Sequence, residues 1–465
     1  MPRLIARPWP CAPTLLAIML LGAFPAAAQT PGHLAPDGTV LKQIVIFGRH
    51  GVRAPVLPGA ALAKFASEPF PDFGVPPGYL TPHGREAQTL LGAFFREYLL
   101  HEHLLTGNLA DDAAHTYLRA NSNQRSTNSA AAFAAGLLPN ATVAVHSHPL
   151  GKPDPVFDPV AAQIVGVDAA RAVREVGGLF DPDGTALASA YSAELSLLRS
   201  VLFGYSADTL PVPATPAGLI DATAIPITLV ASKTNVVTGN VIDAGGLAST
   251  LYAADPFVME YANGLPLAQV AWGRLSAGQL SQQTRIITAQ IGIEMSTPYL
   301  NRLQSSNAVA HILRSLQQVV QGHRVPGAFG DPDSRVLVIN SSDAYIVGLA
   351  GLLQLHWLLP GYQPDYCPPG GAVVLELRQF KANGRHVVRA YFTAQTFDQL
   401  RALTPLTLEQ PPASVQLLIL GGGRGDTLDM DLSEFTQHLE KAIEWAAVQD
   451  PTREEAPGPL STPLQ

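Results

Sequence analysis

Short apolar, β-branched runs alternate along this chain with longer segments in which apolar residues recur at helical spacing. The apolar run at 44–47 ends in a glycine-rich polar turn, and a run bounded in this way is typical of a buried strand. The segment "LTPHGREAQTLLGAFFREYL" predicts a helix with Thr81 as its N-cap and Pro82 at its first position. Next, "HTYLRANSNQRSTNSAAAFAAGLLP" predicts a strand, a polar turn and an Ala-rich helix, and "ATVAVHSH" predicts a further strand.

The pattern changes between residues 153 and 328, where helical segments are joined by Pro- and Ala-rich connectors. Strand patterns then return in "RVLVIN", "GAVVLELRQF", "HVVRAYFTA" and "VQLLIL". A last helix is expected to begin at Asp431, with Glu434 completing a capping-box-like pair. Strands that alternate with helices indicate an α/β sheet covered by helices. We therefore expect an α/β core in two parts, residues 38–152 and 329–449, around an inserted, mainly helical cap at 153–328.

The two ends of the chain differ from the rest. Arg3 and Arg7 precede the short apolar segment "PTLLAIMLLGAF" and the small-residue stretch "PAAAQ". This order predicts a secretory signal peptide, residues 1–28, cleaved after Ala28, and hence a periplasmic or secreted protein. A membrane anchor is the less favoured alternative, because a spanning helix needs about 20 apolar residues. The Pro- and Glu-rich tail at 450–465 is expected to be flexible.

Charge and cysteine content narrow the possible partners. The formal net charge is −8, and removing the signal peptide removes two arginines and no acids, which gives −10. A negative protein is a poor partner for nucleic acid or an anionic membrane, so an anionic small substrate would need a local cluster of cations. The cleaved chain keeps one cysteine, Cys367, and therefore forms no internal disulfide. We predict a structural loop role for Cys367, and we disfavour a cysteine nucleophile because no histidine motif lies near it in sequence.

The turn "GRHGVRAP" follows the first predicted strand and carries the densest chemistry in the chain. Arg49 and Arg53 flank His50, and the planar guanidinium fork matches the oxygens of a phosphate. A neutral imidazole can attack phosphorus, and Gly51 is expected to let the backbone approach the ligand closely. These residues predict an oxyanion site. A basic surface loop and a metal-binding histidine are the alternatives. The metal is disfavoured by the two cations and by the lack of a second His, Asp or Glu nearby in sequence.

The segment "RHGVRAP" matches the R-H-G-x-R-x-P signature of the histidine acid phosphatases, within the phosphoglycerate-mutase-like superfamily. "LTPHG", "LRANSNQRSTNSAAAFAAGL", "LHWLLPG…PPGG" and "FTAQTFDQLRALTPL" resemble further segments of that family in the same order, so the resemblance covers nearly the whole chain after the signal peptide. It implies a phosphoglycerate-mutase-like α/β sandwich with a helical cap. It also implies hydrolysis of phosphate monoesters without a metal or other cofactor.

The resemblance also assigns roles to individual residues. It implies that His50 is the nucleophile and forms a phosphohistidine, while Arg49, Arg53 and Arg125 bind the phosphate. Asp343, in "VLVINSSDAYIVGLAGLL", matches the family's proton donor, which protonates the leaving oxygen and then activates water. The alternative for Asp343 is a helix N-cap, because it precedes an apolar helical segment.

Ser342 is a departure from the family pattern, in which a histidine precedes the aspartate and helps to hold phosphate. Serine donates one neutral hydrogen bond, worth about 0.5–1.5 kcal/mol against about 1.5–3 kcal/mol for a charge-assisted one. The difference is roughly tenfold in rate. Ser341 and Tyr345 are candidates for a replacement donor.

These inferences predict an exported histidine-type acid phosphatase that acts on phosphate monoesters, either sugar phosphates or phytate-like substrates. No cation occurs between the signature and Lys64, which favours monophosphates over phytate. The alternative is a pseudophosphatase that binds phosphate esters with little turnover, because Ser342 replaces the histidine. A cytosolic mutase is disfavoured by the predicted signal peptide.

Overall fold

The computed structural model describes the chain from residue 37 to residue 449, apart from four short gaps; the described ranges are 37–207, 209, 214–232, 241–423 and 427–449. The predicted signal peptide and the predicted flexible tail lie outside the described residues. Within these ranges, every helix is too short or too polar to cross a bilayer.

Eight of the described strands form one large mixed sheet with the order β10-β8-β7-β1-β6-β2-β3, in which β9 pairs with β8. Strands β1, β6, β2 and β3 run parallel, whereas β7, β8, β9 and β10 are joined by antiparallel pairing. The bounds are β1 Thr39–Arg49, β2 Thr116–Ala120, β3 Val145–Ser147, β6 Val336–Ser341, β7 Ala372–Phe380, β8 His386–Ala394, β9 Ala413–Leu417 and β10 Met430–Asp431. A separate hairpin joins β4 Val230–Ala231 to β5 Ile242–Asp243. The sheet and its helices confirm the expected α/β class.

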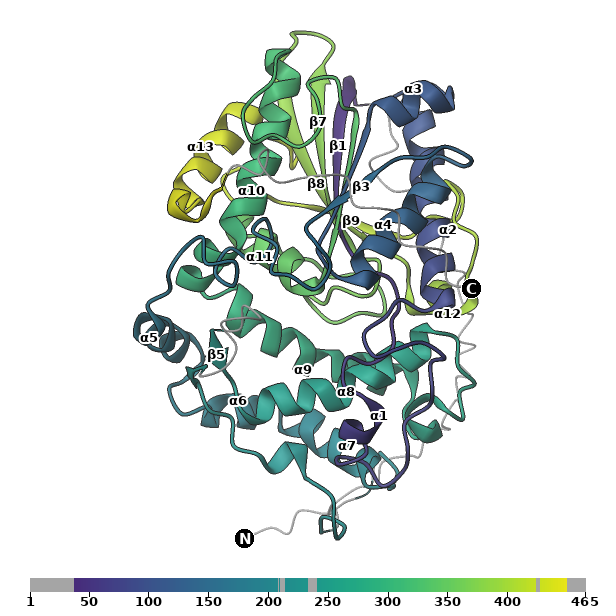
Figure 1. The fold of residues 1–465 in the computed structure, drawn as a ribbon, viewed down its shortest axis with the longest axis vertical. Coiled ribbons are helices and arrows are strands. Elements are labelled where there is room, and N and C mark those ends of the chain that lie inside the picture. The colour runs from purple at the N-terminus through teal and green to yellow at the C-terminus, as the bar shows by residue number, and fades with distance from the viewer. Residues whose placement is uncertain (1–36, 208, 210–213, 233–240, 424–426, 450–465) are drawn as a thin grey trace, which may run out of the picture.

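Helices cover both faces of the sheet (Figure 1). One face carries α2 (Pro82–His101), α3 (Leu109–Ala114) and α4 (Gln124–Leu137), and the other carries α10 (Pro298–Gln321), α11 (Asp343–Leu353) and α13 (Leu432–Ala442). Residues alternate across β1 accordingly. Ile44 and Ile46 pack with the first layer, whereas Val45 and Phe47 pack with the second. A strand buried on both faces reads as a continuous apolar run, which explains the pattern at 44–47.

The remaining helices lie beyond one end of the sheet, in the lower half of Figure 1. They are α1 Gly59–Leu62, α5 Ala169–Phe180, α6 Thr185–Ala190, α7 Ser192–Leu202, α8 Gly246–Ala262 and α9 Ala277–Met295, with α12 Phe397–Ala402 near the boundary. The division of the chain into a core and a cap stays a prediction, but one placement differs from it. Helix α10, expected in the insertion, packs against β1, α11 and α13. A helical pattern shows that a segment has an apolar face, but not which layer that face covers.

The two predicted helix caps differ in outcome. The Thr81 hydroxyl accepts a hydrogen bond from the Gly84 amide at 2.9 Å, and Pro82 occupies the first helical position, so this cap is confirmed. Asp431 is the N-cap residue of α13, but its side chain makes no capping hydrogen bond. Both Asp431 carboxylate oxygens instead lie 3.0 Å from Arg385 Nη1. The predicted helix start at Asp431 is therefore confirmed, but the Asp431 side chain does not make its half of the predicted capping box and binds a neighbouring cation instead.

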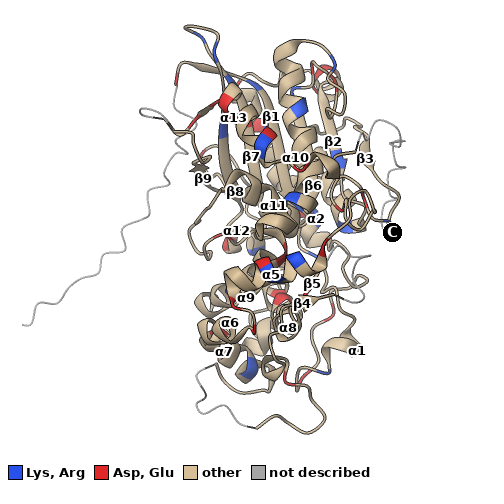
Figure 2. Ribbon diagram, turned by 90° about the vertical axis from the view of Figure 1, so that its left-hand side faces the viewer, with Lys and Arg blue, Asp and Glu red and all other residues tan. Residues whose placement is uncertain are grey.

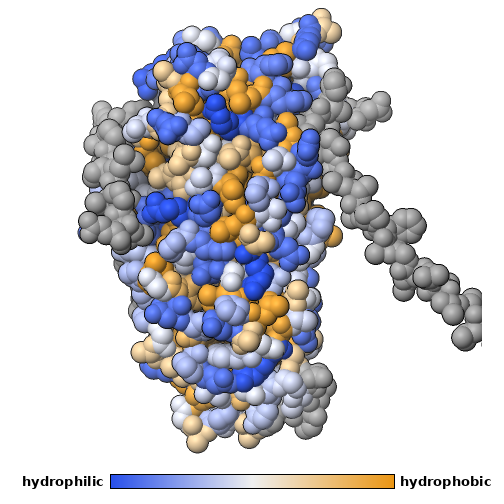
Figure 3. All heavy atoms as spheres, turned by 90° about the vertical axis from the view of Figure 1, so that its right-hand side faces the viewer, coloured by the Kyte–Doolittle hydropathy of each residue, from blue (hydrophilic) through white to orange (hydrophobic). Residues whose placement is uncertain are grey.

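Surface charge is sparse, as expected for a chain with 14% charged residues. Figure 2 shows both acidic and basic residues near the middle of the molecule, where the sheet meets the helices beyond its end. On the face shown in Figure 3, hydrophobic and hydrophilic residues alternate over short distances. Scattered apolar residues of this kind are usual on soluble proteins.

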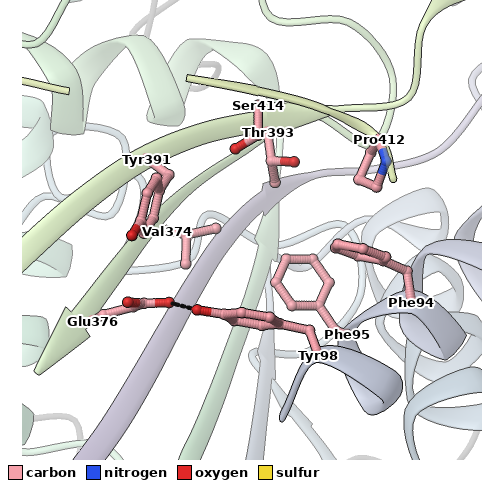
Figure 4. Close-up of a pocket in the computed structure, with 9 residues that line it drawn as sticks. All are labelled: Phe94, Phe95, Tyr98, Val374, Glu376, Tyr391, Thr393, Pro412 and Ser414. Carbon is pink, nitrogen blue, oxygen red and sulfur yellow. Dashed lines mark hydrogen bonds between the residues drawn. The ribbon is translucent and has the colours of Figure 1, made fainter. Parts of the chain in front are cut away.

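A small cavity lies between α2 and the antiparallel strands (Figure 4). Phe94, Phe95 and Tyr98 line it from α2, and the Tyr98 hydroxyl donates a hydrogen bond to Glu376. Its volume is about 20 Å³, which is room for about one water molecule. The cavity is therefore a packing feature, and it is too small to be a substrate site.

Two glycines bring the first signature turn against α2. A Cβ atom on Gly51 would lie 2.7 Å from the Gly84 carbonyl oxygen, and one on Gly84 would overlap the Val52 carbonyl oxygen. The Thr81 amide also donates to that Val52 oxygen at 3.0 Å. Gly51 was expected to admit a ligand. That expectation stays a prediction; the structure shows that a side chain at position 51 would meet the backbone of α2.

We predict that Gly84→Ala lowers the free energy of unfolding by about 1–3 kcal/mol, since the added methyl group must displace packed backbone. Urea denaturation measures the change. Gly178→Ala is the matched control, because Gly178 lies in α5 and a Cβ atom added there would have no neighbouring atom within 4 Å. The control should be neutral or stabilising by up to about 1 kcal/mol. Equal effects at the two positions would contradict the interlocked turn.

Candidate active site

The two turns that the sequence singled out meet at the carboxyl ends of neighbouring parallel strands. In the β1–β6 register, Arg49 lies opposite Ser341. The His50 amide donates to the Ser341 carbonyl oxygen at 2.8 Å, and the Gly370 amide donates to the His50 carbonyl oxygen at 3.1 Å. Open α/β sheets place their ligands at this end of the strands. The pairing of β1 with β6 therefore brings the turn that contains His50 next to the turn that contains Asp343, although the two turns lie far apart in sequence.

Arg49 is buried, with 1% of its surface exposed, and its guanidinium group is bound from two sides. Its Nη2 atom lies 2.9 Å from Asp343 Oδ2, and its Nη1 atom donates to the Cys367 carbonyl oxygen at 2.5 Å. Burial alone would lower the pKa of Arg49, but the Asp343 carboxylate offsets that effect, and the pKa ends above its usual value. Arg49 therefore stays charged at every working pH.

His50 is fixed in one ring orientation and kept neutral. Its Nδ1 atom lies 2.8 Å from the Gly51 carbonyl oxygen, and a carbonyl only accepts, so Nδ1 carries the ring proton. Nε2 then carries the lone pair. Burial lowers the pKa of His50 well below 6.5, and the nearby charges of Arg125, Arg49 and Arg53 lower it further. The imidazole therefore remains a potential nucleophile in acid solution, where an ordinary histidine is protonated.

Arg53 is paired with an acid that the sequence analysis missed. Its Nη1 and Nη2 atoms lie 2.9 Å and 3.3 Å from the two carboxylate oxygens of Asp255, on α8. Asp255 follows the signature by about 200 residues, in a helix outside the sheet. The available signal was a pair of acidic residues, Asp255 and Glu260, on a largely apolar helical segment, "STLYAADPFVMEYA", because a buried charge in such a helix usually has a partner.

Arg125 enters the site from the first turn of α4, after the N-cap residue Asn123. Burial and the charge of Arg53 lower its pKa to about 10, so it is still protonated at neutral pH. In the described part of the chain, the buried Nε atoms of Arg49, Arg53 and Arg125 all lack a hydrogen-bond partner. Three guanidinium groups thus share two carboxylates and keep unsatisfied donors, which is the arrangement that an anion completes.

The second turn places Ser342 and Asp343 at the start of α11. Ser342 is the N-cap residue without a side-chain cap, and Asp343 is the first helical residue. The alternative role of Asp343 as the N-cap is therefore wrong. Neither candidate replacement for the missing histidine is well placed: the Ser341 hydroxyl points to the Gly48 carbonyl oxygen at 3.5 Å, and the Tyr345 hydroxyl donates to Asp158.

Cys367 supports the site through its backbone. Its side chain is 3% exposed, and burial raises the pKa of the thiol, which keeps it protonated. A protonated thiol is a weak nucleophile, so its chemistry fits a structural role. Its carbonyl oxygen, by contrast, binds Arg49 directly.

A pocket of about 150 Å³ opens beside these groups. Arg53, Asp255 and Asp343 form its inner wall, and the facing sides of α8 and α9 form its outer wall. Among the described residues, no group of three or more His, Cys, Asp or Glu side chains could hold a metal ion.

The chain also resembles known proteins. A profile of the Histidine phosphatase superfamily (branch 2) matches residues 40–173. Phytase AppA of Escherichia coli (strain K12) is 30% identical over 416 residues, covering 86% of this chain and 92% of that protein. A glucose-1-phosphatase of Providencia rettgeri is 24% identical, covering 81% of this chain and 86% of that protein.

Solved structures agree with these sequence matches. Hafnia alvei phytase in complex with tartrate superposes with a TM-score of 0.79 at 30% identity, covering 89% of this chain and all of that one. The same phytase in complex with myo-inositol hexakis sulphate gives a TM-score of 0.77. The fold and the site define a histidine-phosphatase class of protein, and this chain belongs to branch 2 of the histidine phosphatase superfamily. It is similar to bacterial phytases and glucose-1-phosphatases, and the family resemblance inferred from the signature is confirmed.

We predict that Arg125→Gln raises the pKa of His50 toward 6.5, because Arg125 exerts the largest effect of the three charges that disfavour the imidazolium. Histidine side-chain NMR across a pH titration measures this. In the wild type, His50 should remain neutral at pH 5.5, about one unit below an ordinary histidine. The exposed Arg174, on α5, provides the control variant Arg174→Gln, which should leave the His50 titration unchanged. A wild-type His50 that titrates near 6.5 would contradict the electrostatic account.

The same shift has a consequence for stability. The unfolded chain binds a proton at His50 below pH 6.5 and the native chain does not, so the unfolded state holds more protons there. Stability is therefore lost as pH falls below 6.5. Arg125→Gln should reduce that loss, which acid denaturation of the two proteins would show.

Proposed function

We propose that this chain is an exported histidine-type acid phosphatase that hydrolyses phosphate monoesters through a phosphohistidine on His50. The observation that carries the proposal is the set of three guanidinium groups, those of Arg49 and Arg53 buried and that of Arg125 partly buried, whose buried Nε atoms are unpartnered around a neutral, oriented imidazole. Such a site binds a phosphoryl group and stabilises the charge that spreads over its oxygens during transfer. Membership of the family and the likeness to phytases and glucose-1-phosphatases support the same chemistry.

In the first proposed step, Arg49, Arg53 and Arg125 hold the phosphate oxygens, and Ser342 donates one neutral hydrogen bond. Nε2 of His50 attacks phosphorus as the ester P–O bond breaks. Protonated Asp343 gives its proton to the leaving oxygen. The bound phosphate competes with Asp343 for the Arg49 guanidinium, which pairs with that carboxylate at 2.9 Å before the ester binds.

In the second step, the Asp343 carboxylate accepts a proton from a water molecule that attacks the phosphohistidine. The P–N bond breaks, His50 regains its lone pair, and inorganic phosphate is released. The mechanism needs no metal or other cofactor, and the proposed partners are small phosphate monoesters rather than nucleic acid or a membrane. The relatives extend the candidate substrates from sugar phosphates to phytate-like molecules.

We predict that the purified protein hydrolyses p-nitrophenyl phosphate from acid to neutral pH in the presence of EDTA, and that His50→Ala abolishes the activity. Asp343→Asn should accumulate phosphohistidine after a rapid acid-free quench with an aryl phosphate, whose leaving group needs little protonation. Released p-nitrophenol and the phosphorylated protein mass measure the two effects. Wild-type protein that is inert throughout this range, beside an active relative, would refute the proposal.

A second candidate function follows from Ser342. Among the described residues, the Ser342 hydroxyl makes no capping hydrogen bond to α11. No such bond therefore fixes its orientation in the place of the family's histidine. A pseudophosphatase would bind phosphate esters in this pocket and release little phosphate. Calorimetry that shows tight binding without released phosphate would favour this function over catalysis.

We predict that Ser342→His raises kcat/KM for p-nitrophenyl phosphate roughly tenfold, because a charge-assisted hydrogen bond to phosphate replaces a neutral one. Steady-state kinetics across acid to neutral pH test this, because the gain is expected only where the new imidazole is protonated. Ser342→Asn is the control for size and neutral hydrogen bonding, and it should give no comparable gain. An unchanged or lower rate in Ser342→His would mean that the missing histidine does not limit this pocket.

A further inference from the structure

The outer wall of the active-site pocket contains one polar pair that the proposed mechanism does not use. Gln290 and Glu294 lie one turn apart on α9, and both line the pocket that Arg53 and Asp343 close on its inner side. Gln290 Nε2 donates a hydrogen bond to Glu294 Oε1 at 3.0 Å. The rest of the outer wall carries one phenol, that of Tyr252, and is otherwise apolar, formed by Ala248, Leu251, Ile287, Ile291 and Met295.

The pair is incomplete without a ligand. Gln290 is 7% exposed, and its Oε1 atom is buried with no hydrogen-bond partner among the described residues. A buried amide oxygen without a donor costs about 1–3 kcal/mol. A group that fills the pocket and donates one hydrogen bond would remove that cost.

Glu294 presents a neutral acid rather than a charge. Burial raises the pKa of Glu294 to about 8, and the negative charge of Asp243, at the end of β5, acts in the same direction. The other charged groups of the pocket are already paired, Arg53 with Asp255 and Asp343 with Arg49. At acid pH, the protonated carboxyl can accept from Gln290 with one oxygen and donate with the other.

We propose that Glu294, together with Gln290, is a specificity-determining site that binds a hydroxyl group on the leaving alcohol of the substrate. This inference rests on the proposed phosphatase function and names its substrate class: monoesters of polyhydroxylated alcohols. A hydroxyl donates to Gln290 Oε1 and accepts from the Glu294 carboxyl at the same time. A second phosphate group carries negative charge even in acid solution. It also meets no unpaired cation among the described residues of the outer wall.

The test compares two substrates that share the phosphate but differ in the leaving group: glycerol 2-phosphate, which carries two hydroxyls, and phenyl phosphate, which carries none. The measured quantity is the ratio of their kcat/KM values. Glu294→Leu should lower that ratio about fivefold, which is the effect of losing one neutral hydrogen bond. The fall should come from a higher KM for glycerol 2-phosphate. Glu294→Gln should keep most of the ratio, because an amide can still donate and accept.

Glu260→Gln is the matched control. Glu260 is also a buried carboxyl whose pKa burial raises to about 8, but it accepts from the Ala271 amide at 2.7 Å and does not line the pocket. Its replacement should leave the ratio as in the wild type. An unchanged ratio in Glu294→Leu, or a fall in the control as large as in Glu294→Leu, would overturn the assignment. So would an equal loss in Glu294→Gln and Glu294→Leu.

Binding to a His50→Ala background separates this inference from the proposed function. Calorimetry there gives Kd for the same two esters whether or not the wild type turns over. Weaker binding of glycerol 2-phosphate but not of phenyl phosphate on adding Glu294→Leu supports the hydroxyl site even if the protein proves to be a pseudophosphatase. Equal effects on both esters overturn it even if the protein is an active phosphatase.

Discussion

Gathering three guanidinium groups beside one imidazole, two of them buried and one partly buried, removes hydration worth several kcal/mol per buried cation, unless carboxylates and carbonyls replace the water. Each replacement in this protein comes from a different part of the chain. Asp343 reaches Arg49 from the start of α11, the Cys367 carbonyl comes from the loop before β7, and Asp255 reaches Arg53 from α8. The site therefore requires that the sheet, its covering helices and the helices beyond its end assemble together. The unsatisfied Nε atoms mark the part of the hydration that the described residues do not replace.

The same arrangement explains why a histidine can serve in acid solution. Imidazole is a useful nucleophile only when neutral, and ordinary histidine is mostly protonated below pH 6. Burial and three cations keep His50 neutral, while the Gly51 carbonyl fixes the proton on Nδ1. The groups that are proposed to bind phosphate thus also prepare the nucleophile. Substrate binding and nucleophile activation have a common electrostatic origin, and no separate general base is needed for His50.

Much of this was predictable because the decisive signals are local. An apolar run followed by "GRHGVRAP" predicted both the buried strand β1 and an oxyanion turn at its end, and parallel pairing with β6 then brings Ser342 and Asp343 to the same edge of the sheet. The family and the α/β class were identified from such motifs. Asp255 was missed because its partner lies about 200 residues away, and an acid in a largely apolar helix does not by itself indicate which residue it pairs with. The placement of α10 and the reason for Gly51 depend on which surfaces pack together, which sequence periodicity does not encode.

The charge balance of the site gives the serine at 342 a physical meaning. Three arginines against Asp255 and Asp343 leave one net positive charge, and a phosphate monoester dianion brings two negative ones. The bound complex is then negative by one charge until Asp343 takes up the proton that the proposed mechanism requires. A histidinium at 342 would neutralise the complex in advance, whereas a serine leaves that task to the proton on Asp343. The replacement need not make the pocket inert; in the proposed mechanism it leaves the neutrality of the complex to the proton that Asp343 donates.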